Sequence, residues 1–408
     1  RANGFGEMSR NMNSFSIDFI LPESFNDKPL PVIYNSWEAT EFNIDVSQQT
    51  ALAELAADIG VELFVMDDGW FGKRNNDRAG LGDWYVNKEK FPNGIDELID
   101  NVNKLGMDFG IWVEPEMVNP DSDLYRAHPD WAYHFEHRNA DELRHQLVLN
   151  MTRGDVQNYI FECLDNLLEN HNIKYIKWDM NRPFSQVGAE NLENAKMYSY
   201  LHTMAVYKIV DELKKRHPQV QFESCASGGG RCDLGAISHY DQVWTSDNTD
   251  AIDRMTIQKG YSLLHPVKTM RAWVTDICGI NKPCSLGIGG NLIKYSAEDL
   301  EICKKNIDFY KSVRNIVQFG DLYRILDIED GEVLCNEYVS TDKNESVVFI
   351  AANATRFFKK KFNLHFAGLD ENKTYSFSLS GDEYVKGGAY LMNVGVPIYV
   401  RGADYNRA

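Results

Sequence analysis

Carboxylates, lysine and tryptophans recur in short polar stretches that each follow an apolar run of the sequence. These stretches are Asn35-Ser-Trp-Glu38, Asp67-Asp68-Gly-Trp70, Trp112-Val-Glu114-Pro-Glu116, Lys177-Trp178-Asp179 and Thr245-Ser-Asp247-Asn-Thr-Asp250. Aromatic rings pack on the apolar face of a pyranose, and carboxylates bind sugar hydroxyls or exchange protons with a glycosidic oxygen. The pattern therefore points to sugar chemistry.

Each stretch taken alone has a structural interpretation. Asp67 and Asp68 could cap a following helix, and Lys177 and Asp179, two residues apart on a strand, could form a structural ion pair. Gly228 to Gly230 could cradle a phosphate, but no Lys-Ser/Thr pair follows, so a tight turn beside a ligand is favoured. The placement of all these groups at successive strand ends favours a ligand site.

Eight apolar runs alternate with helical patterns, which is typical of βα units around a parallel sheet. The runs are 32–34, 61–66, 109–113, 146–150, 173–178, 220–224, 242–245 and 269–274. No Gly-x-Gly-x-x-Gly follows the first run, which argues against a dinucleotide fold. The alternation predicts an α/β fold with a closed (β/α)8 TIM barrel. Because barrel active sites lie at the carboxyl ends of the strands, Asp179 is expected after the fifth strand and Asp247 after the seventh.

Helix signals support this order. Ser47 is expected to cap a helix that ends before Gly60, and the Ser296-Ala-Glu-Asp299 capping box opens a late helix. Helical periodicity also covers 95–105, 156–168 and 191–216. After about Gly320 strands are predicted at 345–352 and 375–379 without a long helix. We therefore expect a barrel over 25–320 and a small antiparallel β-sandwich domain over 321–408.

Composition limits the partners. The net charge of −18, from 60 acidic and 42 basic residues, disfavours nucleic acids and anionic membranes, so a small-molecule substrate is expected. No apolar run is long enough to span a membrane, and the first residues lack a secretory pattern. Seven cysteines are too few for a disulfide framework, which favours a reducing, cytoplasmic location. Neither Cys225 and Cys232 nor Cys278 and Cys284 have metal-ligand spacing, so no metal is predicted.

Five motifs carry a family resemblance. The stretches VMDDGWFG, GIWVEPEMV, YIKWDMNRP, FESCASGGGRCDLG and WTSDNTD resemble glycoside hydrolase family 36, the bacterial α-galactosidases of the melibiase and raffinose type. The resemblance runs in order from about Met8 to about Leu300. It implies that Asp179 is the nucleophile and Asp247 the acid/base, preferred over Asp250 because it occupies the family's position in its motif.

The same resemblance implies the sugar-binding residues. Asp67 and Asp68 match the pair that binds O4 and O6 of galactose, and Lys177 matches a ligand near O3 and O4. Trp112 and Arg144 match further walls of the subsite. Finally, Cys225 and Gly228 match residues that crowd the 2-position.

These assignments imply a retaining, exo-acting α-galactosidase that hydrolyses terminal α-linked galactose from oligosaccharides such as melibiose and raffinose by double displacement. No cofactor is needed. The two catalytic carboxyl groups are expected roughly 5–5.5 Å apart. Lys177, as a nearby cation, is expected to keep Asp179 ionised.

Three alternatives stay open: an α-N-acetylgalactosaminidase on the same scaffold, a raffinose-type galactosyl transferase, and a sugar-binding module without activity. The chain also departs from the family pattern. Residues 1–24 resemble only a remnant or linker of the family's N-terminal β-sandwich domain, and 275–287 looks shorter than the usual connection after the eighth strand. The full-length form is expected to be a homo-oligomer.

Overall fold

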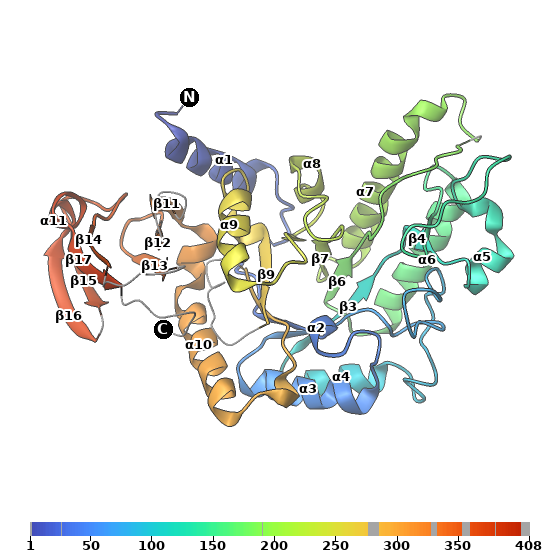
Figure 1. Ribbon diagram of the computed structural model, residues 1–408, viewed down its shortest axis with the longest axis horizontal. Coiled ribbons are helices and arrows are strands. Elements are labelled where there is room, and N and C mark those ends of the chain that lie inside the picture. Colours follow the sequence, from blue (N-terminus) through green and yellow to red (C-terminus); the bar gives the residue numbers. More distant parts are fainter. Residues whose placement is uncertain are drawn as a thin grey trace.

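The computed structural model describes residues 2–25, 27–189, 191–275, 285–327, 333–352, 360–379 and 381–400. Its centre is a closed barrel of parallel strands in which the last strand pairs with the first (Figure 1). In barrel order the strands are β1 (Ile33–Asn35), β2 (Leu63–Met66), β3 (Asp108–Val113), β6 (Tyr175–Trp178), β7 (Gln221–Ser224), β8 (Gln242–Trp244), β9 (Met270–Val274) and β10 (Ser285–Ile288). The predicted TIM barrel is confirmed.

Two strand assignments were wrong. The run 146–150 contains only β5 (Leu147–Val148), which pairs antiparallel with β4 (Met117–Val118) in a small sheet outside the barrel. The eighth barrel strand is instead β10, which lies at the end of the segment interpreted as a connection. Asp179 therefore follows the fourth barrel strand and Asp247 the sixth, not the fifth and the seventh. Most of that segment, 276–284 with Cys278 and Cys284, lies outside the described residues.

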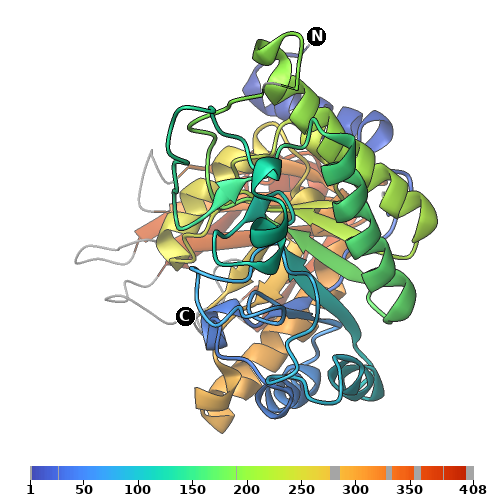
Figure 2. The same ribbon diagram turned by 90° about the vertical axis from the view of Figure 1, so that its right-hand side faces the viewer.

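Helices lie around the outside of the strands (Figure 2). They are α1 (Phe5–Phe19), α2 (Trp37–Thr40), α3 (Val46–Asp58), α4 (Asp96–Lys104), α5 (Asp123–Ala127), α6 (Gly154–Asn170), α7 (Tyr198–Arg216), α8 (Leu234–Ile237), α9 (Ala251–Ser262) and α10 (Ala297–Phe319), with 3₁₀ turns at Pro129–Trp131, Ala195–Met197, Val267–Thr269 and Leu292–Lys294. Their apolar faces pack on the barrel: Leu52, Ala53 and Ala56 of α3 are fully buried. Such burial of apolar stripes supplies most of the stability of short helices.

The helix ends follow the expected capping chemistry with one correction. The Ser296 capping box is present at the start of α10. The cap of α3 is Asp45, whose carboxylate accepts a hydrogen bond of 2.8 Å from the Gln48 backbone N–H, and not Ser47. Within the described ranges, no helix is long and apolar enough to cross a membrane.

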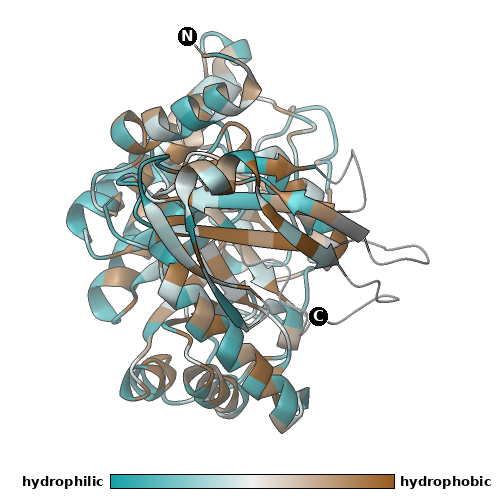
Figure 3. Cartoon of the chain, turned by 90° about the vertical axis from the view of Figure 1, so that its left-hand side faces the viewer, coloured by the Kyte–Doolittle hydropathy of each residue, from teal (hydrophilic) through white to brown (hydrophobic). Residues whose placement is uncertain are grey.

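The predicted C-terminal antiparallel structure is confirmed, as three small sheets of which the first packs against α10 (Figures 1 and 3). They contain β11 (Asp321–Leu326) with β12 (Val333–Val339) and β13 (Ser346–Ala352), β14 (Lys360–Leu364) with β17 (Val396–Val400), and β15 (Thr374–Leu379) with β16 (Asp382–Gly387), and α11 (Gly388–Asn393) follows β16. Their own apolar core includes Cys335, Leu364, Leu391 and Ile398. The exact domain boundaries stay a prediction.

One carboxyl group makes the stability of this region depend on pH. Burial raises the pKa of Glu337 from 4.5 to about 7, although hydrogen bonds from the Ala367 N–H and the Ser346 hydroxyl act to lower it. Because the folded protein holds this proton more tightly than the unfolded chain, stability falls as pH rises from about 4.5 to about 7. A Glu337→Gln variant is expected to lose less melting temperature between pH 5 and pH 8 than the parent.

Thermal melts across that pH range test this expectation. A glutamine can still accept from Ala367 and donate to Ser346, so the variant retains both contacts. Glu383→Gln, at an exposed site on β16, is the matched control and is expected to follow the parent. Identical pH profiles for parent and Glu337→Gln would show that Glu337 is not the group responsible.

Candidate active site

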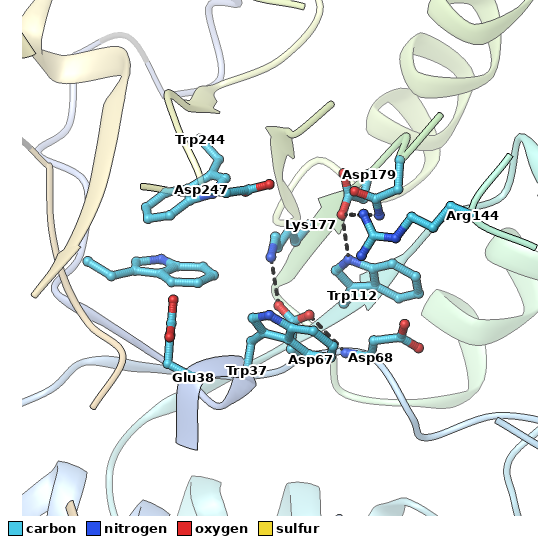
Figure 4. Close-up of a pocket in the computed structure, with 12 residues that line it drawn as sticks. Trp37, Glu38, Asp67, Asp68, Trp112, Arg144, Lys177, Asp179, Trp244 and Asp247 are labelled. Atoms are coloured by element: carbon cyan, nitrogen blue, oxygen red, sulfur yellow. Dashed lines mark hydrogen bonds and ion pairs between the residues drawn. The ribbon is translucent and has the colours of Figure 1, made fainter. Parts of the chain in front are cut away.

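A pocket of about 130 Å³ lies at the carboxyl ends of the barrel strands (Figure 4). It is lined by Trp37, Glu38, Asp67, Asp68, Trp112, Arg144, Lys177, Asp179, Asn181, Trp244, Asp247 and Trp273. All of the site residues that the family resemblance implies are in this lining except Cys225 and Gly228. Of the strand-end stretches, Trp70, Glu114, Glu116 and Trp178 are fully buried outside the lining, so that pattern located the site but not all of its members.

Asp179 is a buried carboxylate held by several donors. Its Oδ2 accepts from Trp112 Nε1 at 3.1 Å and from Asn181 Nδ2 at 2.7 Å, and its Oδ1 accepts from the Met180 N–H at 2.8 Å. Burial raises its pKa, but the charge of Lys177 and hydrogen bonds from Cys225, Asn181 and Trp112 outweigh burial and hold the pKa below its ordinary value. Asp179 is therefore ionised at neutral pH.

Lys177 is the buried cation of the pocket. It lies two residues before Asp179, and side chains two apart on a strand share a face. Its ammonium group donates to Asp67 Oδ2 at 2.8 Å and lies 4.6 Å from the centre of the Trp273 ring. Burial lowers its pKa, but the charges of Asp67, Cys225 and Asp179 more than reverse this, so the pKa is above its ordinary value. The ion pair is thus between Lys177 and Asp67, across the barrel, and not along one strand.

Asp67 and Asp68 leave β2 together but have different partners. Asp67 Oδ2 also accepts from Asn35 Nδ2 at 2.7 Å, whereas Asp68 forms a two-pronged ion pair with the buried Arg74, at 2.9 Å from Nε and 2.8 Å from Nη2. Burial raises the pKa of Asp68 in spite of Arg74. Neither residue caps a helix, since the next helix, α4, starts at Asp96.

Asp247 differs from Asp179 because it is exposed to solvent. Its Oδ1 accepts from Trp244 Nε1 at 2.8 Å, and the Trp244 ring stacks on Trp273 with ring centres 4.0 Å apart. The guanidinium carbon of Arg254 lies over the Trp244 ring, 4.5 Å from the ring centre. The aromatic pair thus orients an exposed carboxyl group, whereas only 5% of Asp179 is exposed.

Cys225 and Gly228 lie behind the lining. Cys225 is buried, and its thiol is hydrogen-bonded to Asp179. Burial, and to a lesser extent the charge of Asp179, raises the pKa of this thiol well above the ordinary value. Gly228 has a φ of +88°, and a Cβ there would lie 2.8 Å from Ser246 Cα and 3.0 Å from the Asp247 nitrogen. Cys225 thus lies against Asp179 and Gly228 against the backbone at Asp247, and contact with the 2-position of a sugar stays a prediction.

Several lining residues were not assigned from the sequence. Trp37 and Glu38 belong to a strand-end stretch, and Asn181 and Trp244 belong to the motifs YIKWDMNRP and WTSDNTD, so their position was a usable signal. Trp273 gave no signal because an aromatic residue within an apolar strand reads as core. Among the described residues no cluster of His, Cys, Asp and Glu could hold a metal ion.

Family comparisons agree with the site. The family model described as Melibiase matches residues 1–320, and the model of the glycosyl hydrolase family 36 C-terminal domain matches residues 334–406. The chain is 39% identical to α-galactosidase AgaA of Geobacillus stearothermophilus over 98% of its own length and 57% of that protein. It is 37% identical to an Escherichia coli α-galactosidase over 92% of its length and 54% of the relative.

Solved structures give the same result. The crystal structure of the Geobacillus AgaA superposes with a TM-score of 0.95 at 38% identity, over 99% of this chain and 58% of that one. Variants of that enzyme have been solved in complexes with 1-deoxygalactonojirimycin, stachyose and raffinose. The chain spans a little over half the length of these relatives. On the family model, the barrel and the shared motifs, it belongs to the melibiase family of glycosyl hydrolase family 36.

Proposed function

We propose that this chain carries the active site of a retaining, exo-acting α-galactosidase, which removes terminal α-linked galactose from oligosaccharides such as melibiose and raffinose. The supporting observation is the contrast between two carboxyl groups in one pocket. Asp179 is buried and ionised, whereas Asp247 is exposed to solvent. A retaining glycosidase needs one ionised carboxylate as the nucleophile and a second carboxyl group in the same pocket as the acid/base.

The proposed reaction has two displacements. Asp179 attacks the anomeric carbon while protonated Asp247 gives its proton to the glycosidic oxygen, so the carbon–oxygen bond breaks and a galactosyl ester of Asp179 forms. Water then enters, Asp247 takes its proton, and the hydroxide oxygen attacks the same carbon. Galactose leaves with its configuration retained and both aspartates return to their first states.

The other polar residues of the pocket are proposed to bind the sugar. Asp67, Asp68 and Lys177 are proposed to bind the O3, O4 and O6 hydroxyls, since charged acceptors and donors in a buried wall form strong hydrogen bonds. Trp112 and Arg144 complete the wall, with Cys225 and Gly228 behind the 2-position. The stachyose and raffinose complexes of the Geobacillus variants support oligosaccharides as substrates.

A comparison of substrates tests this proposal against its nearest rival. The protein is expected to hydrolyse p-nitrophenyl α-galactoside faster than its 2-acetamido analogue, with α-galactose as the first product in proton NMR. Faster cleavage of the analogue would instead favour an α-N-acetylgalactosaminidase, and β-galactose as first product would contradict retention. Oligomeric state and cellular location stay predictions.

Replacing the buried Lys177 is expected to shift the acid limb of the pH profile of kcat/KM. In Lys177→Met the burial of Asp179 is no longer balanced by the charge that lowers its pKa most, so the pKa of Asp179 rises. Because the nucleophile must be ionised, the acid limb of kcat/KM is expected to move to higher pH by about one unit or more.

The measurement is kcat/KM between pH 3 and pH 8. Lys174→Met is the matched control, because Lys174 immediately precedes the same strand but lies outside the pocket. The control is expected to keep the parental profile. An unchanged acid limb in Lys177→Met would show that Lys177 does not set the charge state of the nucleophile.

A further inference from the structure

Asn119 follows β4 and is fully buried behind the pocket. Its Oδ1 accepts from the Leu81 N–H at 2.8 Å and from Arg74 Nη1 at 3.2 Å. Its Nδ2 donates to the Asp77 carbonyl at 3.1 Å and to the His145 carbonyl at 2.7 Å. An asparagine amide has two acceptor and two donor positions, so every one is used.

The hydrogen bonds of Asn119 extend in two directions, and the first leads through Arg74 to Asp68. Arg74, which is buried, shares its guanidinium between Asn119 and both carboxylate oxygens of Asp68. Its ring contacts with Phe42 and Phe71, at 5.1 and 6.0 Å, limit its other orientations. Asn119 therefore helps to fix the direction from which Arg74 holds Asp68.

The second direction leads to Arg144. The Gln146 N–H donates a hydrogen bond of 3.1 Å to the Leu143 carbonyl, which closes a tight turn. The two central residues of this turn, Arg144 and His145, have φ values of +54° and +59°. Two positive φ values at the centre of a tight turn usually call for asparagine or glycine, and other residues cost about 1 kcal/mol or more there. The bond from Asn119 to the His145 carbonyl stabilises this turn.

Arg144 and Asp68 lie on the same side of the pocket, with Trp112 between them in the view of Figure 4. Arg144 is exposed and comes from a loop, whereas Asp68 is buried at the end of β2. Asn119 is the side chain that connects the supports of both.

We propose that Asn119 is a positioning residue that couples Asp68 to Arg144, so that these two pocket walls bind a galactose-configured ring as one unit. The proposal rests on the proposed function, because it assigns both residues to the sugar subsite. Loss of the amide donors releases the Arg144 turn, and a change at the acceptor loosens Arg74.

The test is a double-mutant cycle in the intact protein, with binding of 1-deoxygalactonojirimycin measured by calorimetry. Asn119→Asp keeps the volume but faces two carbonyls without a donor, and it is expected to weaken binding by about 10-fold. Arg144→Ala is expected to do the same. The double variant is expected to lose about 10- to 20-fold and not the ~100-fold of independent sites.

Two further variants make the result decisive. Asn150→Asp changes another buried asparagine, which is hydrogen-bonded to Asn191 and Thr152 outside the pocket lining. This control variant is expected to bind 1-deoxygalactonojirimycin like the parent. Asn119→Ser replaces the aspartate variant if the latter melts below the assay temperature. A Kd within twofold of the parent in the Asn119 or Arg144 variant, or a ~100-fold loss in the double variant, would overturn the coupling. No binding by the parent would contradict the proposed function itself.

Discussion

Asp179→Asn is expected to lower kcat/KM for α-galactosides by about 10⁴-fold or more. The amide fills the same space and can still accept from Trp112, but it cannot form the galactosyl ester. Binding of 1-deoxygalactonojirimycin and the melting temperature are expected to change little by comparison. Activity is measured with p-nitrophenyl α-galactoside.

A smaller variant at the same position tests the geometry of the reaction. In Asp179→Gly, added azide is expected to take the place of the carboxylate and attack the anomeric carbon, which gives β-galactosyl azide. Hydrolysis within 10-fold of the parent in Asp179→Asn, or no azide product in Asp179→Gly, would count against the nucleophile assignment.

Asp247→Ala is expected to damage two steps unequally. The kcat/KM for oligosaccharides such as melibiose, whose leaving oxygen needs a proton, is expected to fall by about 10²- to 10⁴-fold. A galactoside with an acidic phenol is expected to form the galactosyl ester readily and then accumulate it, because no base activates water. The measurement is a burst of phenol release followed by a slow steady state.

Azide again distinguishes the roles. Asp247 is exposed, so azide is expected to reach the galactosyl ester in Asp247→Ala and release α-galactosyl azide, the opposite anomer from the Asp179→Gly product. Asp250→Asn is the control, because Asp250 caps α9 through the Ile252 N–H and lies outside the pocket lining. Equal losses for both kinds of leaving group would contradict an acid/base role.

The sequence predicted the barrel because burial on both faces makes parallel strands apolar, and polar side chains then mark their ends. It failed at 146–150 because a buried two-stranded sheet in a loop is as apolar as a barrel strand. It missed β10 because Ser285-Leu-Gly-Ile288 is short and contains a glycine, so no apolar run is visible. Periodicity does not distinguish such cases.

The site was predicted in part for a similar reason. Residues at strand ends, such as Asp67, Lys177 and Asp179, are visible in a linear pattern. The residues that hold them are not, because their partners are distant in sequence: Arg74 and Asn119 are 45 residues apart, and Lys177 and Asp67 are 110 apart. Only the folded chain shows that Lys177 pairs with Asp67 and that Asn119 reaches the Arg144 turn.

In the proposed mechanism, Asp179 forms the covalent bond to galactose. Treatment with a 2-fluoro-galactosyl donor carrying a good leaving group slows release of the ester, so the adduct can be mapped by peptide mass spectrometry. The predicted result is one labelled peptide with the fluorosugar on Asp179, absent from Asp179→Asn. Labelling of a different residue in the parent protein would contradict the mechanism.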